Sequence, residues 1–442
     1  MRLGAVADDV TGACDLAGRV VEAGLPASVL LGVPVGAVDV FPSDGPGCAV
    51  VALKVRTAPV AEAVVASVGA ARSLMSAGAT QLYQKYCSTF DSTASGNIGP
   101  IADALADVIG ATGSVGTPAT PGARRTQYQG TLFVDGVPLA ESPMRDHPLT
   151  PMRDSDLVRL LAPQTAARVG LIRWEEVRRG ASAVADRVDQ AHMLVDALAE
   201  DDLDVVADAV LRRSADRPVL AGGGAGVATA LARAEVRAGD SDSAGAGADA
   251  GAGAAALPAV PVTGRLILAG SASAATREQI AAFRGERHLL DPLELADGPR
   301  ALGRLRDALA AREDHLAPVL VHASPDVTTA QRALGAGRAA AVLEHALSEL
   351  AGFAVHELGC SHLLVAGGET SGAVTTRLGI TRLQIGRQAA PGVPWAVATT
   401  TDAGASDAGG DRSGDPRTIA VLLKSGNFGE RSLFTDAWEV AP

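Results

Sequence analysis

The stretch Leu3-Gly4-Ala5-Val6-Ala7-Asp8-Asp9-Val10-Thr11-Gly12-Ala13 decides the fold class. Its uncharged beginning predicts a buried strand over Leu3–Ala7. Two carboxylates and a Thr-Gly pair follow at once, before an amphipathic stretch that predicts a helix over Gly12–Ala23. A strand that passes through a polar turn into a helix is the repeating unit of α/β folds. We therefore expect a mainly parallel sheet flanked by helices.

The same alternation recurs along the chain. In the first half the further strands we expect are Ala49–Leu53, Leu82–Lys85, Val169–Ile172 and Val219–Ala221, and the further helices are Ala61–Ala77 and Ile98–Ile109. In the second half the expected strands are Leu266–Ala269, Val319–His322, His362–Ala366 and Ile419–Leu423, and the helices are Ala274–Phe283, Arg300–Ala311, Thr328–Leu350 and Ser371–Leu378. Both halves thus predict an α/β domain of their own.

Low-complexity sequence separates these halves. Ala238–Ala259 is rich in Gly, Ala, Ser and Asp and has almost nothing to bury, which predicts a flexible linker. The domains are then residues 1–237 and 260–442, both of ordinary size. Asp402–Pro416 has the same composition and predicts an extended surface loop.

Composition excludes several classes of protein. Of 442 residues, 47% are hydrophobic and 20% charged, which is typical of a globular chain. A net charge of −12 excludes a general nucleic-acid-binding protein, because such a protein needs a basic surface to bind phosphates. The four cysteines are scattered without a CxxC pair, so we expect neither disulfides nor a zinc site. No secretory or membrane segment is evident before or after Asp8-Asp9, and the expectation is a cytoplasmic protein.

Polar residues follow the expected strands of the first half, where open α/β sheets bind their ligands. A carboxylate of Asp8 or Asp9 could bind a substrate hydroxyl or take its proton, although Asp9 or Thr11 could equally cap the helix. Lys54 and Arg56 stand two apart at a strand end, so extended geometry would point both to one side, a pair that suits a carboxylate ligand.

The densest polar stretch is Gln84-Lys85-Tyr86-Cys87-Ser88-Thr89-Phe90-Asp91-Ser92-Thr93, a long loop after a strand. We interpret Cys87 as an inert thiol, because no His lies near it in the sequence. Only three lysines, Lys54, Lys85 and Lys424, remain among 38 basic residues. An ammonium is a compact point charge unlike a guanidinium, so these positions are candidates for ligand contacts.

Three glycine-bearing turns follow strands of the second half: Gly270-Ser271-Ala272-Ser273, Gly367-Gly368-Glu369-Thr370-Ser371-Gly372 and Lys424-Ser425-Gly426-Asn427-Phe428-Gly429. Glycine lets backbone N–H groups approach an anion, and a helix N-terminus favours negative charge. Together the turns predict a polyphosphate site, with Lys424 reaching phosphate oxygens. No GxxxxGK[ST] occurs, and no GxGxxG follows the first strand, which disfavours a P-loop and a dinucleotide oxidoreductase.

The blocks ADDVTGACD, KYCSTFDSTASGNIGP, AGGETSG and LKSGNFGE resemble the four-carbon acid sugar kinase family, nearly from end to end. Within it, KYCSTFDST is most similar to the 3-oxo-tetronate branch. The resemblance implies an amino-terminal sugar-acid-binding domain and a carboxyl-terminal ATP-binding domain. If each sheet presents its ligand at its own carboxyl edge, we expect the two sites to face each other across an interdomain cleft. The resemblance further implies an ATP-dependent phosphotransferase that converts 3-oxo-tetronate to its 4-phosphate, with Mg2+ and a small-molecule substrate as partners, and leaves a homodimer open.

The resemblance also implies site residues. The sugar acid should lie near Asp8, Asp9, Lys54, Arg56, Lys85 and Asp91, and ATP should contact Ser271, Gly367, Gly368, Glu369, Thr370 and Gly426. Asp9 and Asp91 are equal candidates for the general base, and no metal ligand is assigned. Two alternatives remain: a kinase for erythronate- or threonate-type acids, and a non-catalytic protein that binds sugar acid and nucleotide.

Overall fold

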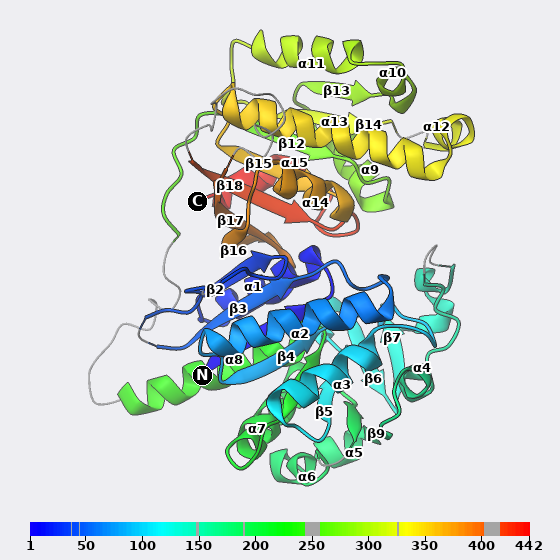
Figure 1. Cartoon of the computed structure of the whole chain (residues 1–442), viewed down its shortest axis with the longest axis vertical. Coiled ribbons are helices and arrows are strands. Elements are labelled where there is room, and N and C mark those ends of the chain that lie inside the picture. The colour runs from blue at the N-terminus through cyan, green and yellow to red at the C-terminus, as the bar shows by residue number, and fades with distance from the viewer. Residues whose placement is uncertain are drawn as a thin grey trace. The chain divides into compact units, whose positions relative to one another are not determined.

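A computed structural model of the chain describes residues 1–36, 38–43, 45–146, 150–188, 191–243, 257–324, 327–401 and 416–442. The chain divides into two compact units, Met1–Ala255 and Ala256–Pro442, whose elements are drawn in Figure 1. Helix α8 (Gly226–Ser243) continues through the beginning of the expected linker, so the prediction of irregular chain from Ala238 onward is wrong for 238–243. Residues 244–256 of that linker, and 402–415 of the expected surface loop, lie outside the described residues.

The first unit is built on a parallel sheet with the strand order β2-β3-β1-β4-β11-β5-β10-β9. Its strands are β1 (Arg2–Ala7), β2 (Ala27–Leu31), β3 (Gly47–Ala52), β4 (Gln81–Lys85), β5 (Ser114–Thr117), β9 (Val169–Ile172), β10 (His192–Val195) and β11 (Leu220–Gly223). The predictions of β1, β3, β4, β9 and β11 are confirmed to within two residues. Strands β2, β5 and β10 were not predicted.

Helices flank this sheet. They are α1 (Val10–Glu22), α2 (Val60–Ser76), α3 (Ile98–Ile109), α4 (Leu157–Leu161), α5 (Trp174–Val177), α6 (Ala181–Ala185), α7 (Glu200–Ser214) and α8. Figure 1 shows α2 and α3 in front of the sheet, and one core joins Val6 and Val51 of the sheet to Leu74 of α2 and Leu105 of α3. The glycine at position 4 permits this contact, because a Cβ there would lie 2.9 Å from the Cβ of Ala79.

The chain segment that connects β5 to β9 forms a small, separate antiparallel sheet. It contains β6 (Arg125–Tyr128), β7 (Thr131–Val134) and β8 (Val137–Pro138). Leu132 and Val134 of β7 enter a core with Tyr86 and Phe90, residues of the long polar loop after β4. The added sheet therefore supports the loop that carries Asp91.

The second unit contains a mixed sheet with the strand order β13-β14-β12-β15-β18-β17-β16. Its strands are β12 (Arg265–Ala269), β13 (Arg287–Leu290), β14 (Val319–Ala323), β15 (His362–Ala366), β16 (Arg382–Ala390), β17 (Val393–Thr400) and β18 (Arg417–Lys424). The pairs from β13 to β18 are parallel, whereas β17 runs antiparallel to both β18 and β16. The four predicted strands are confirmed; the hairpin β16–β17 was not predicted.

The helices of the second unit are α9 (Ala274–Ala282), α10 (Pro292–Ala296), α11 (Arg300–Ala310), α12 (Val327–Leu334), α13 (Ala336–His356), α14 (Gly368–Arg377) and α15 (Leu433–Asp436). The single helix expected over Thr328–Leu350 is broken in two at Gly335, which has a φ of +82°. The core on one face of the sheet joins Ile267, Leu364 and Leu422 to Trp395 and to Phe434 of α15.

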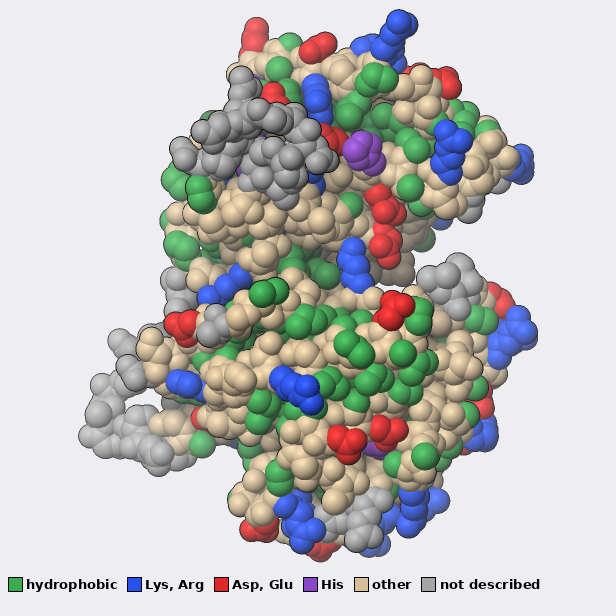
Figure 2. All heavy atoms as spheres, in the orientation of Figure 1, with side chains coloured by type: hydrophobic (Ala, Val, Ile, Leu, Met, Phe, Trp, Pro, Cys, Tyr) green, Lys and Arg blue, Asp and Glu red, His purple; other side chains and the backbone are tan. Residues whose placement is uncertain are grey.

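Two surface properties of the molecule complete the description. Among the described residues, no helix combines the length and the apolar composition that a membrane span requires. Figure 2 shows apolar side chains gathered over the region of α2 and α3, and α2 itself exposes Val60, Val65 and Met75.

Candidate substrate and nucleotide sites

The carboxyl ends of β1, β3 and β4 bring five predicted residues together in the first unit. Ala7, the last residue of β1, is paired with Ala52 of β3 and with Lys85 of β4. The backbone continues this register past the strand ends, because the Asp8 N–H donates to the Lys85 carbonyl and the Val55 N–H to the Asp8 carbonyl. The side chains that follow these strands therefore meet at one edge of the sheet.

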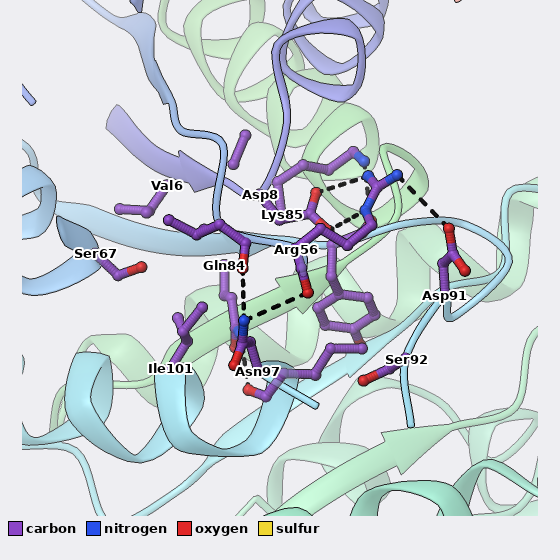
Figure 3. A pocket seen from close by; sticks show the side chains of 14 residues that line it. Val6, Asp8, Arg56, Ser67, Gln84, Lys85, Asp91, Ser92, Asn97 and Ile101 are labelled. Carbon is purple, nitrogen blue, oxygen red and sulfur yellow. Dashed lines mark hydrogen bonds and ion pairs between the residues drawn. The ribbon is translucent and has the colours of Figure 1, made fainter. Parts of the chain in front are cut away.

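Arg56 lies at the centre of this cluster. Its Nε donates to Asp8 Oδ2 at 2.7 Å and its Nη2 to Asp8 Oδ1 at 3.0 Å. Nη2 also lies 3.2 Å from Asp9 Oδ1, and Nη1 lies 3.8 Å from Asp91 Oδ2. Burial disfavours the guanidinium charge, but the neighbouring anions, Asp8 first, outweigh it and raise the pKa of Arg56 well above its ordinary value. Figure 3 shows Arg56 between Asp8 and Asp91.

Asp9 caps helix α1, as its position before Val10 allowed. Its Oδ1 accepts the Gly12 N–H at 2.7 Å, and its Oδ2 accepts the Thr11 hydroxyl at 3.0 Å. Burial alone would raise the pKa of Asp9, but the charges of Arg56 and Lys85 and the Gly12 hydrogen bond lower it. Asp9 therefore combines the two roles that the sequence left as alternatives, helix capping and membership of the charged cluster.

Lys85 ends β4 with its side chain almost wholly buried, at 3% exposure. Its Nζ donates to the Tyr86 carbonyl at 2.9 Å. Gly12 leaves the space for this ammonium group, since a Cβ at that position would lie 3.0 Å from Lys85 Nζ and 2.4 Å from Asp9 Oδ1. Two cations, Arg56 and Lys85, thus stand among three carboxylates.

Asp91 is buried in the loop after β4, and its Oδ1 accepts a hydrogen bond from the Thr150 hydroxyl. Lys54, by contrast, is exposed and does not join the cluster. The extended geometry on which a shared direction of Lys54 and Arg56 depended does not persist, because β3 ends at Ala52 and the chain bends at Lys54 and turns at Arg56.

Asn97 is a functional candidate that sequence reasoning left out of the site. Its buried Nδ2 donates to the carbonyls of Val55 at 2.6 Å and Ala58 at 2.9 Å, the residues on either side of the turn that carries Arg56. Its Oδ1 has no hydrogen-bond partner among the described residues. A signal was available, since the chain contains only two asparagines, Asn97 and Asn427.

A narrow cavity of about 20 Å³ is lined by residues of this cluster, among them Asp8, Arg56, Lys85, Asp91 and Asn97 (Figure 3). A single water needs about 10–15 Å³ of such space. The cavity as it stands holds about one water, so an organic acid that enters must shift the side chains that fill the cluster.

The glycine turns of the second unit converge in the same way. Ala366, the last residue of β15, is paired with Ala269 of β12 and with Lys424 of β18. The Gly270 N–H donates to the Ala366 carbonyl at 3.1 Å and the Gly367 N–H to the Lys424 carbonyl at 3.0 Å. All three predicted turns therefore lie at one edge of this sheet.

Glycine is required where these turns approach one another. Gly367 has a φ of +130°, in a region that side chains avoid. A Cβ on Gly270 would lie 2.2 Å from Thr370 Oγ1, and one on Gly426 would lie 2.3 Å from Ser271 Oγ. The turns leave no room for side chains at these positions.

A cavity of about 340 Å³ opens at the turns. Ser271, Gly367, Gly368, Glu369 and Thr370 line one side of it, as residues predicted to contact ATP. The opposite wall comes from α10, α12 and α13 and is largely apolar: Pro292, Ala330, Ala339, Ala340 and Leu343. The N–H groups that open α14 suit phosphate, and an apolar wall suits a nucleobase. This wall was not predicted, because alanine-rich helices look alike in sequence wherever they lie in a fold.

Lys424 and Gly426 do not line this cavity, although Gly426 lies against Ser271, which does. The Lys424 side chain is fully buried, and its Nζ donates to Thr276 Oγ1, Gln279 Oε1 and the Gly426 carbonyl. A direct contact of Lys424 with phosphate therefore stays a prediction. Among the described residues, no group of three or more His, Cys, Asp or Glu side chains could hold a metal ion. Glu369, exposed in the first turn of α14, is the carboxylate at the turns.

Comparisons with known proteins assign both units. A family described as a sugar-binding N-terminal domain matches residues 3–231, and one described as a nucleotide-binding C-terminal domain matches residues 266–434. The chain belongs to the four-carbon acid sugar kinase family. The charged cluster of Arg56 lies in its sugar-binding domain, and the glycine turns lie in its nucleotide-binding domain.

Curated members of the four-carbon acid sugar kinase family match over the full chain. The chain is 42% identical to the 3-oxo-tetronate kinase of Burkholderia multivorans, over 98% of this chain and 96% of that protein. It is 41% identical to the 3-oxo-tetronate kinase of Methylobacterium radiotolerans, over 100% and 99%. A solved structure from Salmonella typhimurium matches with a TM-score of 0.82 at 35% identity and covers 100% of both chains. One from Haemophilus influenzae matches with a TM-score of 0.75 at 33% identity, over 99% of each.

Proposed function

We propose that this protein is an ATP-dependent kinase for the 4-hydroxyl of a four-carbon sugar acid, with 3-oxo-tetronate as the substrate. The observation that carries the proposal is the cation pair of half-buried Arg56 and buried Lys85, which lies among carboxylates at a sheet edge of a sugar-binding domain. Cations suit the carboxylate of a sugar acid, and carboxylates suit its hydroxyl groups. The relatives named 3-oxo-tetronate kinase supply the choice of substrate.

In this proposal Arg56 and Lys85 bind the substrate carboxylate, and Asp8 orients Arg56 through its two-point ion pair. Asp9 is a poor general base, because both its oxygens accept protein hydrogen bonds and its pKa is lowered. We therefore prefer Asp91 as the group that takes the proton of the 4-hydroxyl. Lys54, which is exposed, drops out of the proposed site.

The glycine turns support ATP as the phosphoryl donor. They fit a polyphosphate, because the positions of Gly270, Gly367 and Gly426 exclude side chains and α14 begins at Gly368. Magnesium would neutralise phosphate charge when bound with the nucleotide, and Glu369 of the turns and Glu344 of α13 are the carboxylates that line the cavity. Ser271 and Thr370 would donate to phosphate oxygens.

Transfer requires the sugar acid of one domain to meet the nucleotide of the other, so an active site between the two domains remains our prediction, as do a homodimer and a cytoplasmic location. Two alternatives remain. One is a kinase for erythronate- or threonate-type acids, and the other is a non-catalytic protein that binds both ligands.

The test is an ADP-release assay with a panel of four-carbon acids. We expect the highest kcat/KM with 3-oxo-tetronate. A higher value for erythronate or threonate would replace the substrate, and no ADP release with any acid, from protein that is stabilised by ATP and by sugar acid, would support the non-catalytic alternative.

The variant Asp91→Asn separates chemistry from nucleotide binding. It should cripple phosphoryl transfer, whereas its ATP affinity, measured by calorimetry without sugar acid, should stay within a few-fold of that of the wild type. Loss of ATP binding in this variant would contradict the assignment of the two ligands to separate domains.

A further inference from the structure

Lys424 stands at the end of β18 with its ammonium group fully enclosed by protein. Its Nζ donates to Gln279 Oε1 at 2.7 Å, to Thr276 Oγ1 at 3.0 Å and to the Gly426 carbonyl at 3.1 Å. An ammonium has three N–H donors and no acceptor, so these three neutral partners use its full hydrogen-bonding capacity.

The same partners fix the turn that follows β18. The Gly426 carbonyl also accepts from Ser273 Oγ at 2.6 Å and from Thr276 Oγ1 at 2.9 Å. Gln279 Nε2 donates to the carbonyls of Phe428 at 3.0 Å and Gly429 at 2.9 Å. Lys424 therefore joins the side chains of α9 to the turn at Gly426.

The backbone of Lys424 fixes a second turn, because its carbonyl accepts the Gly367 N–H at 3.0 Å. A Cβ on Gly367 would lie 3.3 Å from the Ser271 nitrogen, and one on Gly426 would lie 2.3 Å from Ser271 Oγ. Through its backbone and side chain, Lys424 is thus connected to the region where the three glycine turns approach one another.

The charge of this ammonium is not balanced by a protein anion. The charged side chains on the elements around it are Arg277 and Glu278 of α9, Glu369 and Arg377 of α14, Arg417 at the far end of β18, Glu430 and Arg431 of the following turn, and Asp436 of α15. Arg377 is half-buried and paired with Glu349, and the others are exposed. Within the described part of the chain no carboxylate forms an ion pair with Lys424. His362 belongs to the neighbouring strand β15, but at its far end, where it is buried.

A buried cation without a counter-ion is expensive, and it tends to lose its proton. Burial lowers the pKa of Lys424 from its ordinary value of 10.5 to about 8. Phe434 lies under the ammonium at 5.8 Å from the ring centroid, a weak compensation compared with an anion.

We propose that Lys424 is a positioning residue for the phosphate-binding turns whose buried charge is balanced by the bound polyphosphate, so that nucleotide binding draws a proton onto Lys424. The inference rests on the proposed function, since it takes the polyphosphate of ATP or ADP as the missing anion. It assigns Lys424 a role without direct contact: the ammonium orders the turns through Thr276, Gln279 and Gly426, and it acts on the phosphates through space.

Isothermal titration calorimetry of the full chain with ADP and magnesium tests this proposal. The titration is run in Hepes and in Tris, whose different ionisation enthalpies report the number of protons taken up. At pH 8 about half of Lys424 is unprotonated in the free protein, so we expect uptake of about half a proton per ADP. The uptake should grow towards one proton at pH 9 and vanish near pH 7. The terminal phosphate, with a pKa of about 6, is already ionised in this range.

Two variants assign the proton to its residue. Lys424→Met should abolish the uptake and raise KM for ATP at least tenfold, with KM for the sugar acid unchanged within twofold. Lys424→Arg keeps a charge that does not titrate in this range, so it should bind ADP without proton uptake. The split between the two KM values separates positioning of the turns from a general loss of structure.

Each outcome decides the proposal. ADP binding by the wild-type protein without proton uptake between pH 7 and 9 would overturn it, whether or not the variants fold. Uptake that persists in Lys424→Met would assign the proton to another group and would overturn it as well. If ADP does not bind at all, the proposed function itself fails, and this inference fails with it.

Discussion

Arg56 and Asp8 form a two-point ion pair, with Nε to Oδ2 at 2.7 Å and Nη2 to Oδ1 at 3.0 Å. The pair joins residues 48 positions apart in the sequence, because β1 and β3 are neighbours in the sheet. A planar guanidinium is needed for this geometry, since its N–H groups match both oxygens of a carboxylate. The pair fixes the orientation of the cation that we assign to the substrate carboxylate.

Arg56→Lys tests that geometry. A lysine keeps the charge but cannot make the two parallel hydrogen bonds, so we expect KM for the sugar acid to rise at least tenfold, about 1.4 kcal/mol, with KM for ATP unchanged. The matched control is Arg72→Lys on the exposed face of α2, which should alter neither constant. Equal effects of the two substitutions would contradict a role for Arg56 in the site.

Asn97→Asp tests the support behind Arg56. The substitution removes the donors to the Val55 and Ala58 carbonyls and sets a carboxylate against them. We expect a loss of about 1–3 kcal/mol in the free energy of unfolding, measured with urea, and a raised KM for the sugar acid. Normal KM at reduced stability would limit Asn97 to a structural role in the turn.

Gly426→Ala tests the close approach of the glycine turns. The added Cβ would lie 2.3 Å from Ser271 Oγ and 3.0 Å from Ser273 Oγ, so these hydroxyl groups must move, and we expect KM for ATP to rise at least tenfold. Gly303→Ala in α11 is the control, because a Cβ there meets nothing within 4 Å and alanine favours a helix. Steady-state kinetics of both variants should show an effect in the first alone.

The pH dependence of stability tests the burial of Lys424. Its pKa is about 8 in the folded protein and 10.5 when unfolded, so between these values the unfolded chain binds more protons. Stability of the nucleotide-free protein should therefore rise from pH 8 to 10.5, by up to about 3 kcal/mol relative to Lys424→Met, and stay level with pH below 8 as far as Lys424 contributes. Urea unfolding of both proteins across this range measures the difference. Parallel curves would show that Lys424 keeps its ordinary pKa.

The sequence was informative where chemistry is concentrated. The turn after β1 and the loop after β4 could be recognised, because carboxylates and a lysine follow apolar strands directly. The residues predicted there and at the end of β3 do lie together: Asp8, Asp9, Arg56, Lys85 and Asp91. The glycine turns could also be recognised in the sequence, because glycines directly after an apolar strand indicate a special backbone conformation and not a buried core.

Other features depend on tertiary contacts that one sequence does not reveal. The exposure of Lys54 could not be predicted, because the chain leaves the strand after Ala52 and the Val55 N–H bonds the Asp8 carbonyl, a contact with a different strand end. The scarcity of asparagine marked Asn97 as unusual, but its place beside Arg56 could not be predicted, because its partners Val55 and Ala58 lie some 40 positions away and offer only backbone carbonyls. The hairpin β16–β17 has no polar cluster at its ends to mark it as separate strands.

The crowding of Arg56 by three carboxylates has a consequence for what the site rejects. A ligand that reaches Arg56 competes with Asp8, Asp9 and Asp91 for the N–H groups of one guanidinium. The carboxylate of a sugar acid can compete through charge-assisted hydrogen bonds of its own, whereas the hydroxyl groups of an uncharged sugar accept weaker ones. We therefore expect the protein to discriminate against abundant neutral aldoses and ketoses electrostatically, without any steric barrier against their hydroxyl groups.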